Sequence, residues 1–130
     1  MAGIVQTYTT AITDDAGRVV ASKAKAVTGD SEEEFSVSCP GSSNVSVPLT
    51  IAQAGMVSFW VVSDAADVTM TVNDDGSPDL TVALTANVPY FWNADMGANP
   101  ITADLTGASA LKFTKSSAGA ATVKGAFLNT

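Results

Sequence analysis

The most constraining feature of this sequence is a two-residue alternation of apolar and hydroxyl-bearing side chains that recurs in short runs. Residues 35–39, 45–51, 68–72 and 80–84 each place a large apolar side chain or Cys at every second position, mostly with Ser or Thr between. Because successive side chains of a β-strand point to opposite faces, each run predicts a strand with one buried and one exposed face. Pro48 fits an edge strand better than a central one.

Two further runs are apolar on both faces. Residues 56–63 (MVSFWVVS) and 88–93 (VPYFWN) predict strands with one face on the core and the other against a neighbouring subunit. Residues 110–114 and 122–128 predict the last two strands. Turn-forming Gly, Pro, Asp and Asn separate the runs, and about eight strands spaced by roughly 8–12 residues are typical of an antiparallel β-sandwich or barrel. We expect at most one helical turn, in residues 94–105.

The first 28 residues differ from the rest. Ile4, Tyr8 and Ile12 share one face of an extended segment, and residues 14–17 carry a turn signal. The following stretch is rich in Ala and Lys and has few large apolar groups to bury. Because such a segment buries little surface by itself, we predict that residues 1–28 form an N-terminal arm or edge hairpin ordered by pairing with something else. Residues 29–130 then form the sandwich domain.

The composition excludes several classes of function. The 130 residues suffice for one domain with one core. The absence of histidine and the single cysteine exclude a Ser-His-Asp triad, a His-ligated metal, an intrachain disulfide and a zinc–thiolate cluster. Six Lys and Arg against thirteen Asp and Glu give a net charge of −7, which argues against a nucleic-acid partner. We therefore expect no enzyme and no cofactor.

The sequence also gives no sign of a membrane protein. No apolar run approaches the roughly 20 residues needed to span a bilayer. The first ten residues, MAGIVQTYTT, lack the basic segment and apolar core of a secretory signal. The sequence therefore predicts a soluble domain that neither crosses nor binds a membrane.

The acidic loop from Asn73 to Asp79 is the best place for a metal ion. Asp74, Asp75 and Asp79 could supply oxygen ligands to a calcium ion that stabilises the domain. However, the twelve-residue calcium loop and its closing Glu are absent, and Asp-Asp-Gly-Ser-Pro is ordinary connector chemistry between strands. We predict a turn with no metal.

A second acidic stretch, Asp30 and residues 32–34, is the only run of charge. It could be a docking patch for a basic partner. It could equally be the solvated start of a strand whose charges discourage pairing at a sheet edge, which is the interpretation that we favour.

The two runs that are apolar on both faces hold four of the nine aromatic residues, namely Trp60, Tyr90, Phe91 and Trp92. Such residues stack on sugars, anchor protein interfaces or fill cores. We expect Trp60 and either Tyr90 or Trp92 to fill the core, with one or two aromatics exposed. If Tyr90 and Trp92 face inward, Phe91 must face outward.

Reactive groups are scarce. Cys39 is in phase with buried positions and has no basic neighbour in the sequence, so we predict a buried, unreactive thiol. Among the carboxylates, only Asp95, near Trp92, has an apolar setting that would raise a pKa toward catalytic use. We predict no catalytic site.

Three stretches resemble the capsid decoration (cement) proteins of tailed bacteriophages, which have a small jelly-roll fold. They are TGDSEEEFSVSCPGSSNVSVPLTI, SFWVVSDAADVTMTVNDDGSPDLTVALTANVPYFWN and ATVKGAFLN. The resemblance implies a structural virion protein, made in the host cytoplasm, that sits as a dimer or trimer on the capsid exterior and binds the major capsid protein.

The interface residues expected on this basis are Ile4, Tyr8, Ile12 and Phe91. The resemblance implies that the N-terminal arm reaches across a subunit boundary. The alternative is a carbohydrate-binding β-sandwich module of a tail fibre or surface adhesin, which would use Trp60, Tyr90, Phe91 or Trp92.

Overall fold

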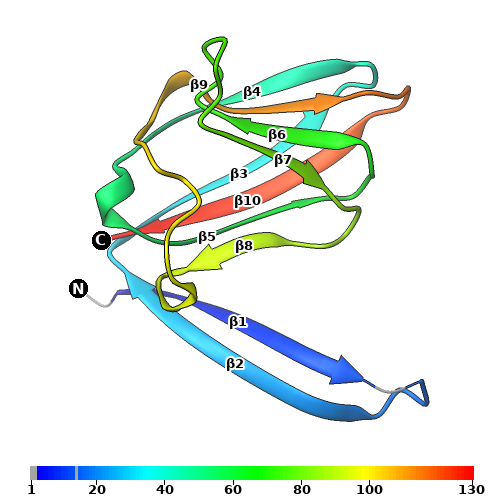
Figure 1. Cartoon of the computed structure of the whole chain (residues 1–130), viewed down its shortest axis with the longest axis vertical. Helices are drawn as coiled ribbons and strands as arrows, with labels where there is room; N and C mark the ends of the chain where they lie inside the picture. Colours follow the sequence, from blue (N-terminus) through cyan, green and yellow to red (C-terminus); the bar gives the residue numbers. More distant parts are fainter. Residues whose placement is uncertain (1–2, 14) are drawn as a thin grey trace.

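The structure, a computed structural model, describes residues 3–13 and 15–130 and consists almost entirely of β-strands (Figure 1). The strands are β1 (Ile4–Thr13), β2 (Val19–Gly29), β3 (Ser31–Cys39), β4 (Ser43–Ile51), β5 (Met56–Ser63), β6 (Val68–Val72), β7 (Leu80–Leu84), β8 (Tyr90–Asn93), β9 (Leu105–Lys115) and β10 (Ala121–Asn129). Two 3₁₀ turns, Gln53–Gly55 and Ala94–Met96, are the helical segments of the described chain. None of its helices has the length and apolar character needed to cross a bilayer.

Eight of the strands form two antiparallel sheets that pack face to face. The strand orders are β3–β10–β5–β8 and β4–β9–β6–β7 (Figure 1). The pairing is nested, because β6 pairs with β7, β5 with β8, β4 with β9 and β3 with β10. The chain between residues 31 and 129 therefore folds like one long hairpin rolled up on itself. The prediction of an all-β antiparallel sandwich is confirmed.

Phe59 lies at the centre of the core between the two sheets. Its ring stacks on Phe127 with centroids 5.4 Å apart and lies 5.8 Å from Tyr90 and 6.1 Å from Trp92. Phe113 from the opposite sheet is also fully buried. These positions follow from the alternating pattern, since every second residue of each strand enters the same apolar layer.

One charged group is buried at an end of the sandwich. Lys115 is only 5% exposed, and its ammonium donates to Asp67 Oδ1 at 3.2 Å and to Ser117 Oγ at 2.8 Å. Hydrogen bonds from Ser117 in the first place, and then from Lys115, lower the pKa of Asp67 to about 2. This network joins the loop before β6 to the loop between β9 and β10.

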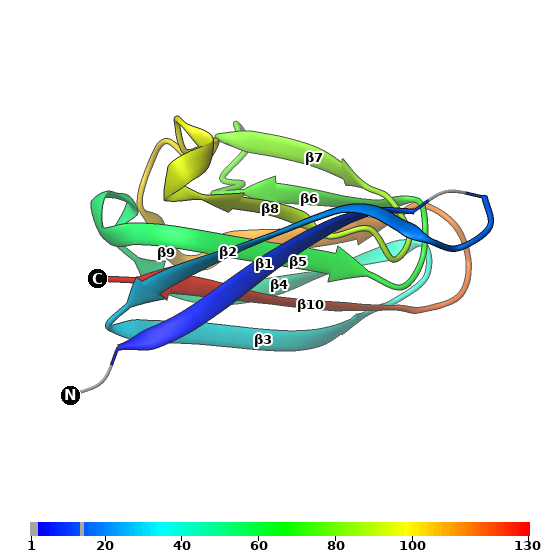
Figure 2. The same ribbon diagram turned by 90° about the horizontal axis from the view of Figure 1, so that it is seen from below.

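The remaining two strands form a separate hairpin. β1 and β2 pair from Ile4 with Gly29 to Thr13 with Val19, and they run across the outer face of the β3–β10–β5–β8 sheet (Figures 1 and 2). Gly29 ends the hairpin where it meets β10, and a Cβ at this position would lie 2.6 Å from the backbone oxygen of Asn129. The hairpin can approach β10 this closely only because residue 29 has no side chain.

The structure corrects some strand bounds. β9 begins at Leu105 rather than at residue 110, because residues 105–107 continue the pairing with β4. The acidic residues 32–34 lie within β3, an edge strand, and not ahead of it. Pro48 lies in the edge strand β4, as predicted, where the pairing register shifts between Val47 and Leu49.

Candidate functional site

The outer face of the β3–β10–β5–β8 sheet carries Trp60, contrary to the prediction that this residue fills the core. The register places Trp60 in one row across the sheet, with Phe91 on one side and Ala126 and Glu34 on the other. Phe59 and Val61 take the inward positions of β5 and are fully buried. Because the residue between them must point outward, Trp60 is half-buried on the outer face.

The aromatic run of β8 divides between the two faces. Tyr90 and Trp92 both face the core, whereas we predicted that only one of them would join Trp60 there. The Trp92 indole donates from Nε1 to the backbone oxygen of Gly97 at 3.1 Å. Phe91 consequently faces outward, as the alternation required once its neighbours face inward.

The outward-facing Phe91 is partly covered by the hairpin. Its ring stacks on Tyr8 of β1, with centroids 5.2 Å apart and planes inclined by 21°. Burial raises the pKa of Tyr8, with a smaller opposing contribution from its interaction with Ser58. The second face of β5 and β8, which we predicted to contact a neighbouring subunit, is therefore covered in part by the hairpin of the same chain.

Gln6 connects the hairpin to the sheet through its side-chain amide. Gln6 Oε1 accepts hydrogen bonds from Tyr8 Oη at 2.8 Å and from Ser58 Oγ at 2.6 Å. Gln6 Nε2 donates to Glu32 Oε2 of β3 at 2.6 Å. Sequence reasoning missed this role, although the phase of Gln6 with Ile4 and Tyr8 puts all three on one face of β1.

An exposed ion pair links the other hairpin strand to the sandwich. Lys25 of β2 pairs with Asp95 in the turn after β8, and both side chains are more than half exposed. The expectation of an apolar setting for Asp95 is therefore wrong, because its side chain is exposed and its carboxylate pairs with a lysine.

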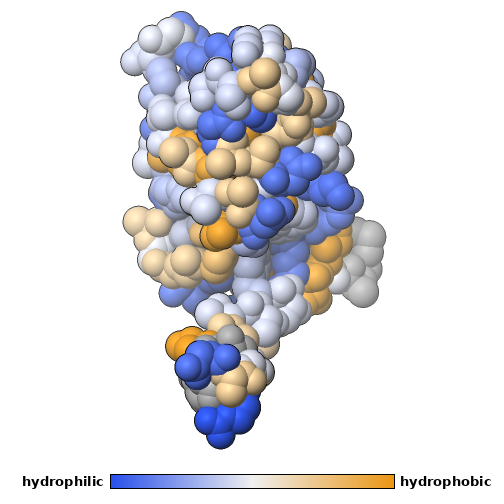
Figure 3. Space-filling view, turned by 90° about the vertical axis from the view of Figure 1, so that its right-hand side faces the viewer, coloured by the Kyte–Doolittle hydropathy of each residue, from blue (hydrophilic) through white to orange (hydrophobic). Residues whose placement is uncertain are grey.

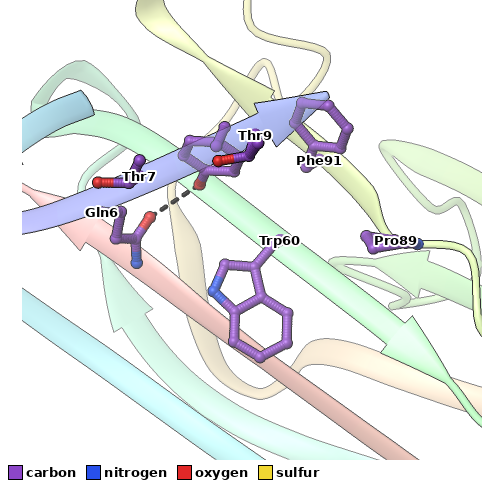
Figure 4. A pocket seen from close by; sticks show the side chains of 7 residues that line it. Gln6, Thr7, Thr9, Trp60, Pro89 and Phe91 are labelled. Atoms are coloured by element: carbon purple, nitrogen blue, oxygen red, sulfur yellow. Dashed lines mark hydrogen bonds between the residues drawn. The ribbon is translucent and has the colours of Figure 1, made fainter. Parts of the chain in front are cut away.

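Two hollows adjoin at Trp60. The first, of about 360 Å³, lies between β1 and the sheet and is lined by residues 6–9 together with Trp60, Pro89 and Phe91 (Figure 4). The second, of about 450 Å³, lies over β3 and β10 and is lined by Glu34, Ser36 and Lys124 among others. We call the two hollows together the Trp60 groove.

The four predicted interface residues do not form one patch. Tyr8 and Phe91 contact each other within the chain, while Ile4 and Ile12 lie at opposite ends of β1. Ile12 is 60% exposed near the tip of the hairpin. Figure 3 shows the tip at the bottom as a lobe that projects beyond the sandwich, with hydrophobic and hydrophilic side chains side by side. Their contact with a partner stays a prediction.

The acidic loop makes internal hydrogen bonds. Asp74 accepts from the backbone N–H of Gly76 at 3.2 Å and from Lys112 Nζ at 3.3 Å, and these contacts, the Gly76 bond foremost, lower its pKa. Asp79 accepts from Asn73 Nδ2 at 2.9 Å. Within residues 3–13 and 15–130, no three His, Cys, Asp or Glu side chains gather in an arrangement suited to a metal ion. Asp74, Asp75 and Asp79 occupy a turn.

The cysteine and the acidic residues of β3 make contacts within the chain. Cys39 has no exposed surface, and burial raises the pKa of its thiol, which donates to the backbone oxygen of Phe113 at 3.3 Å. A hydrogen bond with Glu32 raises the pKa of Glu34. Glu32 thus faces the hairpin, where it accepts from Gln6, and Glu34 lines the Trp60 groove.

Comparisons of this chain with protein families, with curated proteins and with solved structures find no match.

Proposed function

We propose that this chain is a structural assembly protein whose sandwich is the rigid body and whose β1–β2 hairpin contacts neighbouring protein subunits. The observation that carries the proposal is the apolar surface of the hairpin. Val5, Ile12 and Val19 are 56%, 60% and 62% exposed. Such a concentration of exposed branched side chains on one small element is typical of an interaction surface.

The backbone of the hairpin supports the same role. In the described chain β1 and β2 pair only with each other, so each strand has an outer edge with unpaired N–H and C=O groups. A strand of another subunit can add to such an edge, and the alternating side chains then supply specificity. The ten residues of β1 are long enough for this kind of pairing.

The more specific form of the proposal is a capsid decoration protein of a tailed bacteriophage. The nested pairing of the eight sandwich strands supports a jelly-roll assignment. The composition, without histidine and with a single buried cysteine, supports a structural rather than a catalytic role. The chain would then bind the major capsid protein on the exterior of the virion as a dimer or trimer, after synthesis in the host cytoplasm.

In this proposal the chain stabilises the capsid through many weak contacts. Each hairpin offers a modest apolar area, so a single contact is weak. When several copies associate and each binds the lattice, the second and later contacts become intramolecular and the assembly gains avidity. A shell decorated in this way resists expansion by the pressure of the packaged genome.

The test compares the hairpin tip with a matched exposed position. The double variant Ile12→Ser/Val19→Ser removes apolar surface that does not support the sandwich. The control Val88→Ser removes a side chain that is 53% exposed just before β8. Occupancy on expanded, undecorated capsids of the phage that encodes the chain is measured by co-sedimentation.

We expect the tip variant to lose most of its occupancy and the control to keep it. A deletion of residues 1–29 should also abolish binding, but it uncovers the fully buried Leu128, so the tip variant decides the matter. Full occupancy by the tip variant, or no binding by the intact chain, would overturn the proposal.

A further inference from the structure

The Trp60 groove is a built surface rather than an accidental depression. Its centre is fixed by the register of β5, which holds the Trp60 side chain outward between two fully buried residues. One wall is fixed by the stack of Phe91 on Tyr8. Figure 4 shows the indole beneath β1, with Gln6 on one side and Pro89 and Phe91 on the other. The groove is therefore preformed, and a ligand need not pay to order it.

The first hollow combines flat apolar walls with small hydrogen-bonding groups. Trp60, Pro89 and Phe91 provide the apolar surface, and the polar residues Gln6, Thr7 and Thr9 of β1 complete the lining (Figure 4). Mostly apolar lining with a few polar groups that fix orientation is the usual make-up of a small-molecule site, and about 360 Å³ is within the usual range.

The second hollow adds charges of both signs. Glu34 and Ser36 of β3 and Lys124 of β10 surround the far side of the Trp60 indole. The Lys124 ammonium forms no ion pair or hydrogen bond with a described residue, so its three donors are available to a ligand. Hydrogen-bonding groups thus flank the Trp60 side chain in both hollows.

This arrangement selects among ligand classes. A sugar ring presents an apolar C–H face that covers an aromatic plane and a rim of hydroxyls that both donate and accept hydrogen bonds. A nucleic acid or an acidic glycan is disfavoured, because residues 30–130 carry eleven acidic side chains against three lysines. A proline-rich peptide would use the aromatic walls but would leave the Lys124 and Glu34 charges without partners.

We propose that the Trp60 groove binds an uncharged oligosaccharide, with one sugar ring stacked on the Trp60 indole and its neighbours in the two adjoining hollows. Lys124 and Glu34 bond to hydroxyls on one side, and β1 closes the groove on the other. This inference does not rest on the proposed assembly function, because it uses the face of the sheet and not the hairpin tip.

The intrinsic fluorescence of the chain provides the assay. The chain has two tryptophans, and Trp92 is only 8% exposed, so a saccharide in the groove changes the emission of Trp60 and protects it from iodide quenching. The intact chain is screened on an array of neutral glycans. Hexasaccharides of glucose, mannose and N-acetylglucosamine, and one proline-rich decapeptide, are then titrated by fluorescence and calorimetry.

We expect at least one neutral glycan to bind, and Trp60→Ala to weaken its affinity by about tenfold or more. Lys124→Ala should weaken it about threefold, with the fold untouched because its side chain is exposed. Val88→Ala is the control and should leave affinity unchanged. The melting temperature of each variant separates lost binding from lost folding.

Three results would overturn the inference. The first is the absence of binding to any glycan of the array. The second is a folded Trp60→Ala variant that binds a glycan as tightly as the unmodified chain does. The third is binding of the proline-rich peptide without binding of any glycan. Capsid binding by the same preparations is measured separately, so failure of the glycan site leaves the assembly proposal standing.

Discussion

In the sandwich, Phe59 and Phe127 stack at 5.4 Å with no exposed surface, whereas the corresponding stack of the hairpin, Tyr8 on Phe91, leaves both rings partly exposed. Both regions are made from strands with alternating side chains. In the sandwich each sheet covers the apolar face of the other. The hairpin covers one face of a sheet, and nothing in the described chain covers its own outer face (Figure 2).

The difference teaches that the same local pattern can produce two levels of stability. Strands in the sandwich open only when the whole core opens, because they share one buried cluster. Among the described apolar side chains of the hairpin, Val27 alone is buried. The hairpin is therefore expected to detach in a local opening that costs much less free energy than global unfolding.

The largest expected effect is that of Phe59→Ala. Removing a fully buried aromatic side chain from the sandwich should lower the free energy of unfolding by about 3–5 kcal/mol. The matched change is Phe91→Ala in β8, the strand that pairs with β5, where the side chain lies on the outer face of the sheet. It should lower the free energy of unfolding by about 1 kcal/mol. Urea unfolding followed by circular dichroism measures both. Equal losses for the two variants would show that the hairpin and the sandwich form one cooperative unit.

A smaller effect is expected at the charged end of the sandwich. The pKa of Asp67 is about 2 in the folded chain, against an ordinary value of 3.8. Because protonation favours the unfolded chain, the stability from this carboxylate is complete above about pH 4 and is lost as the pH falls toward 2. Asp67→Asn should lower stability at neutral pH and flatten the dependence between pH 4 and 2.

The control for this acid prediction is Asp75→Asn, which removes the same charge from the exposed loop before β7. Its acid unfolding curve should follow that of the unmodified chain. If the stability of the Asp67→Asn variant falls between pH 4 and 2 as steeply as that of the unmodified chain, the Asp67–Lys115–Ser117 network does not contribute to acid stability.

A third effect is confined to the hairpin. Tyr8→Ala removes the stack on Phe91 and the hydroxyl that bonds Gln6. Such an aromatic pair is worth about 0.5–1.5 kcal/mol, so amide exchange in β1 and β2 should accelerate about 3–10-fold. The exchange of amides in β5 and β10 should not change, and the midpoint of global unfolding should fall only slightly. Acceleration throughout the sandwich would contradict a separate hairpin opening.

The sequence predicts the sandwich well because its determinants are local. Alternation places Leu111, Phe113 and Met70 inward without knowledge of any partner strand, and turn residues mark where strands end. Strand order is not local, since residues 40–120 separate β3 from β10, with which it pairs. Nothing in the pattern of one strand specifies its neighbour.

The candidate site was harder to predict for a related reason. In β5 both faces are apolar, so periodicity does not tell whether Phe59 or Trp60 enters the core. The register and the size of the core decide, and Phe59 has the position opposite Phe127. Gln6 joins the hairpin to the sheet across a separation of 52 residues to Ser58, a distance over which sequence spacing carries no information.

The smallest expected effect is that of the ion pair between Lys25 and Asp95. Both groups are exposed, so Lys25→Ala should cost the docked hairpin less than about 1 kcal/mol. Since salt screens exposed charges, exchange in β2 should accelerate as sodium chloride rises from 0.01 to 0.5 M in the unmodified chain, but not in Lys25→Ala. Asp95→Asn is the reciprocal control and should behave in the same way. If the salt dependence persists in both variants, the hairpin is held electrostatically by the whole acidic sandwich rather than by one pair, since residues 30–130 carry eleven acidic side chains against three lysines.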